Sequence, residues 1–360
     1  MQPVSGGRTS HRTFDQLSGA IPLFVIGWRE VFVPLAVVLH NQHGSTLAVA
    51  GLAIAASRLG GWLHAKGSFR RPPYEAALLG GIALLLLGLA PEEGPVGLLL
   101  WFVFGVTWPI LQEALAARFW QGRAGAAVLL TGMIVAGPLA SGPGTWLIAG
   151  CFFFLAWRIG PTQAASAPLE AEIPVAHEPP ARSDRGQALP FLFSFASLMW
   201  IWLIPAQLID LGLAPQSFGI LVAAGWLARL GGAWMVGRQR LRLPRGTMPT
   251  IIGLGLLVAL GLIASAHNLW QLVIGMIVYG ALIGIVGVYP TIERPELGRL
   301  PGRAQALGEV LGPLAGVAAY LLGGPLAVFA SAALATIALS IVLLTQPRKP
   351  TTLTPDTPTL

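Results

Sequence analysis

An arginine and a glutamate lie side by side in the apolar stretch VIGWREVFVP, residues 25–34. Charged side chains are costly in the middle of a hydrocarbon layer, and they persist mainly where they face a protein interior or water. Glu30 could bind and release a proton there, whereas Arg29 stays charged and could hold an anion. We predict that both residues reach an aqueous cavity and couple it to protons. An ion pair that only holds helices together is the alternative.

Aromatic residues also occupy unusual places. Trp and Tyr prefer the two membrane interfaces, where their polar atoms are wet. In this chain several of them lie within about two residues of the centre of an apolar segment, a count taken along the sequence. They are Trp108, Trp200, Trp226 and Tyr279. Together with Arg29 and Glu30 they are predicted to line a substrate cavity, and large apolar filler between helices is the alternative.

Composition shows which elements must position these side chains. Charged residues form 10% of the chain and hydrophobic residues 54%, which excludes an ordinary soluble protein. Twelve apolar windows have about the length needed to cross a bilayer, although the sixth is short, and the fold class is therefore predicted to be an all-α integral membrane protein. The windows run near 18–40, 46–65, 74–91, 97–117, 125–142, 145–160, 189–210, 217–236, 248–266, 269–290, 304–323 and 326–345.

The net charge of +7 is distributed in a way that orients the chain. With the N-terminus inside, the outer loops at 40–45, 91–97 and 211–216 contain no Lys or Arg, and the basic residues gather in the inner loops. This is the positive-inside pattern, so we predict a multi-pass cell-membrane protein with both termini cytoplasmic. The basic excess therefore indicates no nucleic-acid partner. Arg58 and Arg229, in inner halves of spans, are expected to snorkel to the inner surface.

The chain divides in the middle. Residues 161–188 are rich in Pro and Ala and read as a flexible cytoplasmic linker. The predicted order is a cytoplasmic N-terminus at 1–17, a six-helix half at 18–160, the linker, a second six-helix half at 189–345, and a cytoplasmic tail at 346–360. The sequence RLGG at 58–61 recurs at 229–232, an offset of 171 residues, which indicates that the two halves are repeats.

With two six-span halves, the chain resembles the major facilitator superfamily over essentially its whole length. The loop GGWLHAKGSFRRPP at 60–73 is similar to that family's Gly-x-Leu-x-Asp-Arg-x-Gly-Arg-Arg signature, although Ala65 replaces the aspartate. GEVLGPLAG at 308–316 has the spacing of an antiporter Gly-Pro motif, with a packing role expected for its glycines.

The resemblance also implies a gate, because in sugar-porter members pairs of acidic and basic residues hold the cytoplasmic gate closed. Acidic and basic residues occur where several spans leave the membrane on that side. A solvated, charge-balanced loop is the alternative. The predicted gate residues are Arg70, Arg71, Glu113, Arg118, Glu293, Arg299 and Glu309.

These features predict a secondary transporter that works by alternating access, not an enzyme. Proton-coupled export of an amphipathic compound is favoured, and proton-coupled uptake of an organic anion or other nutrient is the alternative. A polytopic scaffold or receptor is less consistent with the sequence, which contains no folded soluble region. No cofactor or metal site is expected, and the partners are a small-molecule substrate, protons and the bilayer. The sequence leaves the oligomeric state open, with a monomer plausible.

Overall fold

The computed structural model describes residues 20–21, 24–25, 27–29, 31–33, 35, 47–66, 72–89, 95–119, 123–138, 142–166, 184–237, 247–293 and 303–345. Within these ranges every regular element is helical, which confirms the all-α prediction. After the described helical residues between 20 and 35, the elements are α2 (Leu47–Ala65), α3 (Pro73–Leu87), α4 (Pro95–Phe119), α5 (Arg123–Ala136), α6 (Gly142–Ser166), α7 (Asp184–Leu198), η1 (Ile201–Leu203), α8 (Ile204–Asp210), η2 (Pro215–Ser217), α9 (Phe218–Gly237), α10 (Met248–Ala264), α11 (Leu269–Glu293) and α12 (Arg303–Thr345).

Helix α12 consists of two helices that meet at a pair of glycines. Gly323 has φ −156° and ψ 21°, and Gly324 has φ 69° and ψ −162°, so neither residue is helical. Glycine adopts a positive φ at little steric cost, and Pro325 then starts the next helix because it needs no N–H partner there. Residues 303–322 and 325–345 are therefore separate spans, as the apolar windows predicted.

The segment at 184–210 is interrupted in the middle. α7 ends at Leu198, Met199 and Trp200 form a bend, and η1 then leads into α8. The indole Nε1 of Trp202 donates a hydrogen bond to the Met199 carbonyl oxygen at 2.8 Å, which satisfies a backbone acceptor that the break would leave without a helical partner. The single apolar window at 189–210 did not indicate this break.

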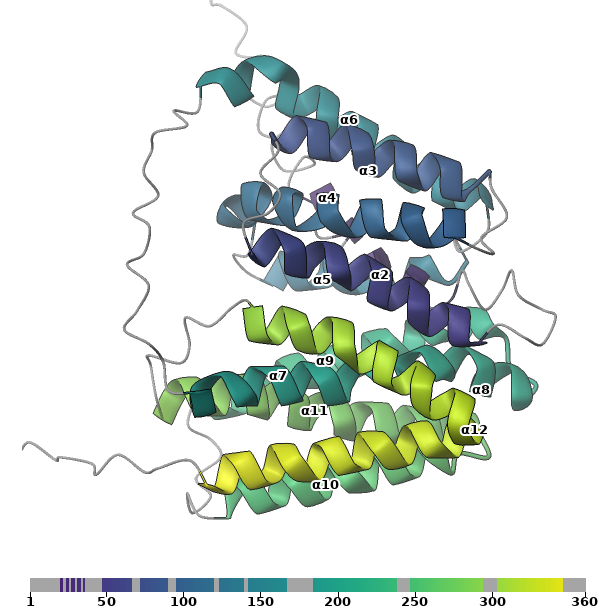
Figure 1. The fold of residues 1–360 in the computed structure, drawn as a ribbon, viewed down its shortest axis with the longest axis vertical. Coiled ribbons are helices and arrows are strands. Elements are labelled where there is room, and N and C mark those ends of the chain that lie inside the picture. Colours follow the sequence, from purple (N-terminus) through teal and green to yellow (C-terminus); the bar gives the residue numbers. More distant parts are fainter. Residues whose placement is uncertain are drawn as a thin grey trace, which may run out of the picture.

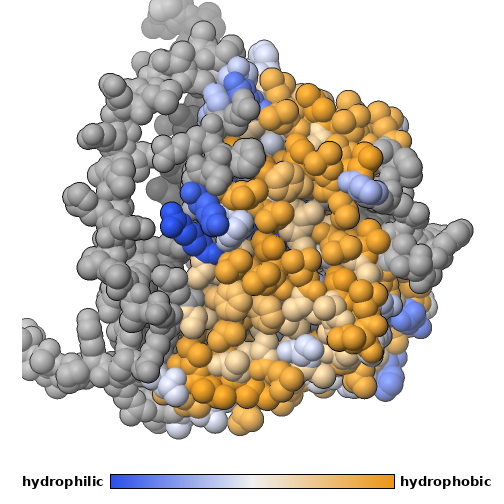
Figure 2. Space-filling view, viewed as in Figure 1, coloured by the Kyte–Doolittle hydropathy of each residue, from blue (hydrophilic) through white to orange (hydrophobic). Residues whose placement is uncertain are grey.

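Large apolar side chains are exposed on the outside of the bundle. Leu322, Leu326 and Trp270 are 89%, 76% and 73% exposed. Figure 2 shows such a surface running over both groups of helices, with the strongly polar side chains mostly near its margins. Among the described residues, five helical segments are long and apolar enough to cross a membrane, and the remaining apolar helices are shorter. An apolar exterior of this kind is the surface that lipid requires.

The helices form two groups with the same internal packing (Figure 1). The first half contains the described helical residues between 20 and 35 and α2–α6, and the second half contains α7–α12. In the first half α2 packs on α4 and α3 on α6; in the second half α9 packs on α11 and α10 on α12. These pairs correspond through the repeat. The two pseudo-symmetric halves predicted from the sequence are therefore present.

Glycines allow the helices inside each half to approach closely. A Cβ atom on Gly105 of α4 would overlap the backbone of Ser57 in α2, and one on Gly280 of α11 would overlap that of Gly225 in α9. Three glycines of α12 pack in the same way: Gly308 and Gly312 lie against the backbone of Phe191 and Phe195 in α7, and Gly316 lies against that of Met199 in the bend after α7. The packing role predicted for GEVLGPLAG is thus confirmed, because small residues let backbones come together.

Among the described residues, the most extensive contacts between the two halves form two seams, α2 against α12 and α5 against α9. At the second seam a Cβ on Gly137 would overlap the carbonyl oxygen of Gln216, and one on Gly219 would overlap that of Met133. We call the contact of Met133–Gly137 with Gln216–Gly219 the outer seam, since the predicted topology places it near the outer surface. Backbone-to-backbone contact leaves no room there for a solvated passage.

Candidate functional site

Arg29 is buried in the first half with its guanidinium group surrounded by polar and aromatic partners. Its side chain is 7% exposed. Nη2 donates a hydrogen bond to the hydroxyl of Ser57 on α2 at 3.1 Å, and Cζ lies 5.9 Å from the ring centroids of both Phe104 and Trp108 on α4. Aromatic faces attract a cation most strongly where water is excluded. The charge is therefore held in place by its surroundings.

The aromatic partners of Arg29 belong to a continuous stack inside the first half, here called the aromatic column. Trp28 and Phe32 stack with centroids 4.0 Å apart, Phe32 lies 5.7 Å from Trp101, and the contacts continue through Phe104 to Trp108. The sequence analysis found only Trp108 of these. Spacing was the available signal, because Trp101, Phe104 and Trp108 follow one another at i, i+3 and i+7 and so share a helix face.

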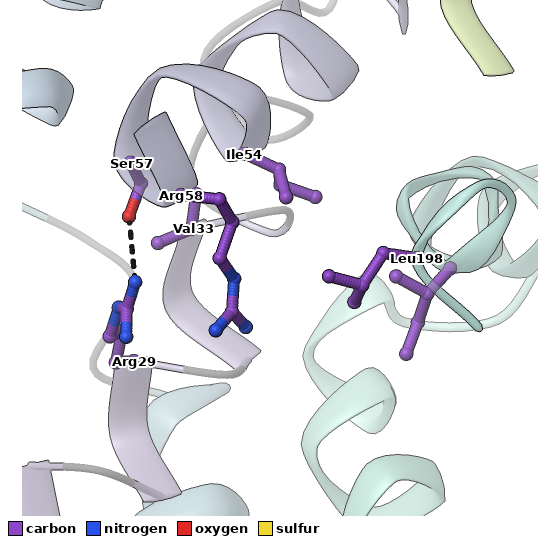
Figure 3. Close-up of a pocket in the computed structure, with 7 residues that line it drawn as sticks. Arg29, Val33, Ile54, Ser57, Arg58 and Leu198 are labelled. Carbon is purple, nitrogen blue, oxygen red and sulfur yellow. Dashed lines mark hydrogen bonds between the residues drawn. The ribbon is translucent and has the colours of Figure 1, made fainter. Parts of the chain in front are cut away.

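A small cavity of ≈ 30 Å³ lies between the halves beside Arg29 (Figure 3). Its volume can hold ordered water but no organic molecule in this conformation. The first half supplies five lining residues, two of which are arginines. Among the described lining residues there is no Asp or Glu. The second half supplies the opposite wall, on either side of the α7 break. The lining residues are Arg29, Val33, Ile54, Ser57, Arg58, Leu198 and Ile201.

Arg58 connects this cavity to the second half. Its Nη1 lies 3.2 Å from Oε2 of Glu309 on α12, and Gln305 donates a hydrogen bond to the other carboxylate oxygen at 3.1 Å. The two charged side chains are only 17% and 24% exposed. Arg58 therefore makes an ion pair across the α2–α12 seam, a partner that the sequence analysis did not predict.

Of the other predicted cavity residues, Trp108 lies beside Arg29, and the remaining three belong to the second half. Trp200 is fully buried at the α7 break, with its ring perpendicular to that of Tyr279 at 5.0 Å. The Tyr279 hydroxyl donates a hydrogen bond to Ser197 at 3.2 Å. Trp226 lies under the guanidinium of Arg229 at 4.6 Å. The structure therefore brings Trp108 to Arg29 and Tyr279 to Trp200, but Trp108, Trp200, Trp226 and Tyr279 are not among the residues that line the cavity in Figure 3.

Several predicted site residues fall outside the described part of the chain. Glu30, Arg70, Arg71 and Arg299 are not described, nor are the side chains of Glu113, Arg118 and Glu293. Their assigned roles in proton coupling and in the cytoplasmic gate stay predictions. Of the predicted gate residues, Glu309 alone has a described side chain.

Solved transporter structures superpose on nearly the whole chain. The nucleoside transporter NupG does so with a TM-score of 0.64 at 12% identity, covering 92% of this chain and 97% of its own. A bacterial homologue of the human lysosomal transporter Spinster gives 0.59 at 15%, covering 92% and 94%, and the D-xylose-proton symporter gives 0.58 at 12%, covering 93% and 98%. The chain has the major facilitator fold. No protein-family model and no curated protein sequence matches it.

The major facilitator fold explains why the seams occur where they do. The first-half helix α2 meets the first part of α12, and the corresponding helices of the repeat, α9 and α5, meet each other. Transporters built from repeats place their binding sites near mid-depth at the interface of the repeats. The cavity beside Arg29 and Arg58 has walls from both halves.

Proposed function

We propose that this protein is a secondary active transporter that carries a small molecule across the membrane by alternating access. The observation that carries the proposal is the cavity at the interface of the halves, because two arginines face it from a mostly apolar wall. Burying two guanidinium groups in a membrane protein is costly, and such groups usually mark a substrate or ion pathway. The fold supplies the rocking motion of one half against the other.

Of the two predicted substrate classes, the site favours the organic anion over the amphipathic compound. Guanidinium groups bind carboxylates and phosphates through paired hydrogen bonds, and Arg29 and Arg58 both face the cavity. The aliphatic side chains of Val33, Ile54, Leu198 and Ile201 would contact an apolar body. An amphipathic cation would meet like charge at the same place.

Proton coupling through Glu30 and Arg29 remains part of the proposal, as do the cytoplasmic gate and a cell-membrane location with both termini inside. The names of the D-xylose-proton symporter and the peptide transporter POT support transport in proteins of this fold, and the first names a proton as the coupled ion. Whether this protein takes up or exports its substrate is to be determined by the vesicle experiment below, in which the pH gradient is imposed in both directions.

The test is transport by the purified protein in lipid vesicles with an imposed pH gradient. Labelled monocarboxylates and an amphipathic cationic dye are offered separately, in both gradient directions. Accumulation of a carboxylate that collapses with an uncoupler supports the proposal. Two results together would refute transport. Neither class of compound would accumulate in the vesicles, and the labelling of cysteines placed at both seams would not respond to any added compound.

A further inference from the structure

Helices α3 and α6 pack together and form the lipid-facing edge of the first half, at the end of the molecule away from the second half (Figure 1). We propose that the bilayer is locally thinned along this edge, and that phospholipids with short acyl chains occupy it in preference to those with long chains. The inference rests on the membrane-embedded fold and not on the proposed transport, so it is tested without any substrate.

Helix α3 is short, and both of its ends are described. It runs for 15 residues between an N-cap at Pro72 and a C-cap at Gly88. At 1.5 Å per residue the helix covers about 22 Å, whereas a typical hydrocarbon core is about 30 Å thick. Polar groups shorten its apolar part further, because the Tyr74 hydroxyl and the Glu75 carboxylate lie in the first turn. Along the helix axis Glu75 and Gly88 are about 20 Å apart.

Two exposed tryptophans on α6 mark nearly the same levels. Trp146 is 45% exposed and Trp157 is 70% exposed. They are 11 residues apart in the sequence, which places them on one face of the helix. A Cβ atom on Gly88 would overlap the indole Nε1 of Trp146, so this tryptophan lies at the C-terminal end of α3. Tryptophan favours the boundary between hydrocarbon and headgroups. The α6 tryptophans therefore put the two boundaries about 17 Å apart at this edge.

The last span provides the comparison, because it is the sixth span of its half, as α6 is of the first half. It runs from residue 325 to 345, and its exposed side chains from Leu326 to Leu344 are all apolar. These two leucines are about 27 Å apart along the helix axis, which is close to the thickness of an ordinary core. The row contains no tryptophan. Local thinning therefore distinguishes the α3–α6 edge from the last span.

A bilayer of ordinary thickness would place polar groups of this edge in hydrocarbon. The Glu75 carboxylate or the indole N–H groups of Trp146 and Trp157 would then lie among acyl chains, and a charged group is costly there. Thinning the bilayer avoids this at a modest cost for each ångström of mismatch. Phospholipids with shorter chains form a thinner core, so they need less compression. Chains of 14 carbons therefore fit this edge better than chains of 18 or 22 carbons.

The experiment measures the depth of single spin labels on the full-length protein in vesicles of dioleoyl phosphatidylcholine. With Cys151 replaced by serine, labels are attached one at a time to Trp146→Cys, Trp157→Cys, Ala330→Cys and Ile341→Cys. The last two residues are also exposed and 11 residues apart, so they form the matched control in the last span. Depth is read from the collision rates of each label with oxygen and with a water-soluble nickel chelate.

We expect both α6 labels to lie at headgroup depth and at least one label of the control pair to lie within the hydrocarbon. Leu89→Cys repeats the measurement at the end of α3 with both tryptophans in place, since that side chain is 64% exposed. It should also read headgroup depth. Either α6 label deep in the hydrocarbon, or equal depths for the two pairs, would overturn local thinning.

The preference for short chains is tested by thermal unfolding in vesicles of phosphatidylcholine with monounsaturated chains of 14, 18 or 22 carbons. The unfolding temperature should be highest with 14 carbons and lowest with 22, because mismatch at the α3–α6 edge grows with chain length. An unfolding temperature that is independent of chain length, or highest with 22 carbons, would refute the preference.

Discussion

Alanine at Gly219 is expected to favour the conformation in which the outer seam is open. Gly219 lies at the start of α9, and a methyl group there would overlap the carbonyl oxygen of Met133 on α5. Optimal separation of non-bonded heavy atoms is about 3.5–4.0 Å, so the two backbones would have to part by roughly 1 Å. A change of rotamer cannot relieve the overlap, because the atom that is met belongs to the main chain.

The size of the effect follows from the place of the contact. Adding a methyl group to a well-packed contact costs about 1–3 kcal/mol. Here α5 and α9 belong to different halves, so the cost falls on the closed seam and disappears when the halves separate. A bias of that size changes the ratio of open to closed conformations by about 5- to 150-fold.

The ratio can be measured by the rate at which a membrane-impermeant maleimide labels a cysteine at Ala136. That side chain is fully buried beside the outer seam, and the native Cys151 is first replaced by serine. Gly280→Ala is the control, because its methyl group would overlap the backbone of Gly225 within one half. It should lower thermal stability without faster labelling. Equal labelling of Gly219→Ala and its parent, or an equal increase in the control, would refute the reasoning.

Three other changes test the fold and the site. Trp200→Ala should lower the free energy of unfolding by about 3–5 kcal/mol, measured by denaturant titration in detergent, because the ring is fully buried against Tyr279 and Phe329; a loss below 1 kcal/mol would contradict a packing role. Glu30→Gln should leave a folded protein that exchanges substrate but cannot accumulate it in vesicles with an imposed pH gradient, and wild-type accumulation would exclude the coupling role. Cysteines at 211–216 should be labelled from outside the cell, whereas labelling only after permeabilisation would reverse the topology.

Long apolar windows made most of the fold predictable. A segment of about 20 apolar residues must satisfy its backbone hydrogen bonds internally in lipid, and this decides the helical state whatever the neighbours are. The turn between the last two spans was also visible, since Gly323, Gly324 and Pro325 end one helix and begin another. Likewise, RLGG at 58–61 and 229–232 indicated the two halves without any contact information.

The site was less predictable because its partners are remote in sequence. Arg58 and Glu309 are 251 residues apart, so no local pattern joins them. Ser57 is an ordinary small residue in a span until Arg29 is placed opposite to it. The α7 break has no signal in hydropathy either, since residues on both sides are apolar and Pro205 follows the break at the start of α8.

The interruption of the seventh span would affect the kinetics of the proposed transport cycle. A continuous helix transmits motion from end to end, whereas a bend at Met199 and Trp200 lets α8 tilt while α7 stays packed on α12. Leu198 and Ile201 line the cavity on either side of this bend. In the proposed cycle, this cavity wall would be able to close over a bound molecule before the halves finish rocking. The cycle would then pass through an occluded intermediate, with the molecule sealed from both aqueous phases. In the proposed transporter such a state would set the turnover rate separately from affinity, and under the proposed proton coupling it would limit the leak of protons during each transition.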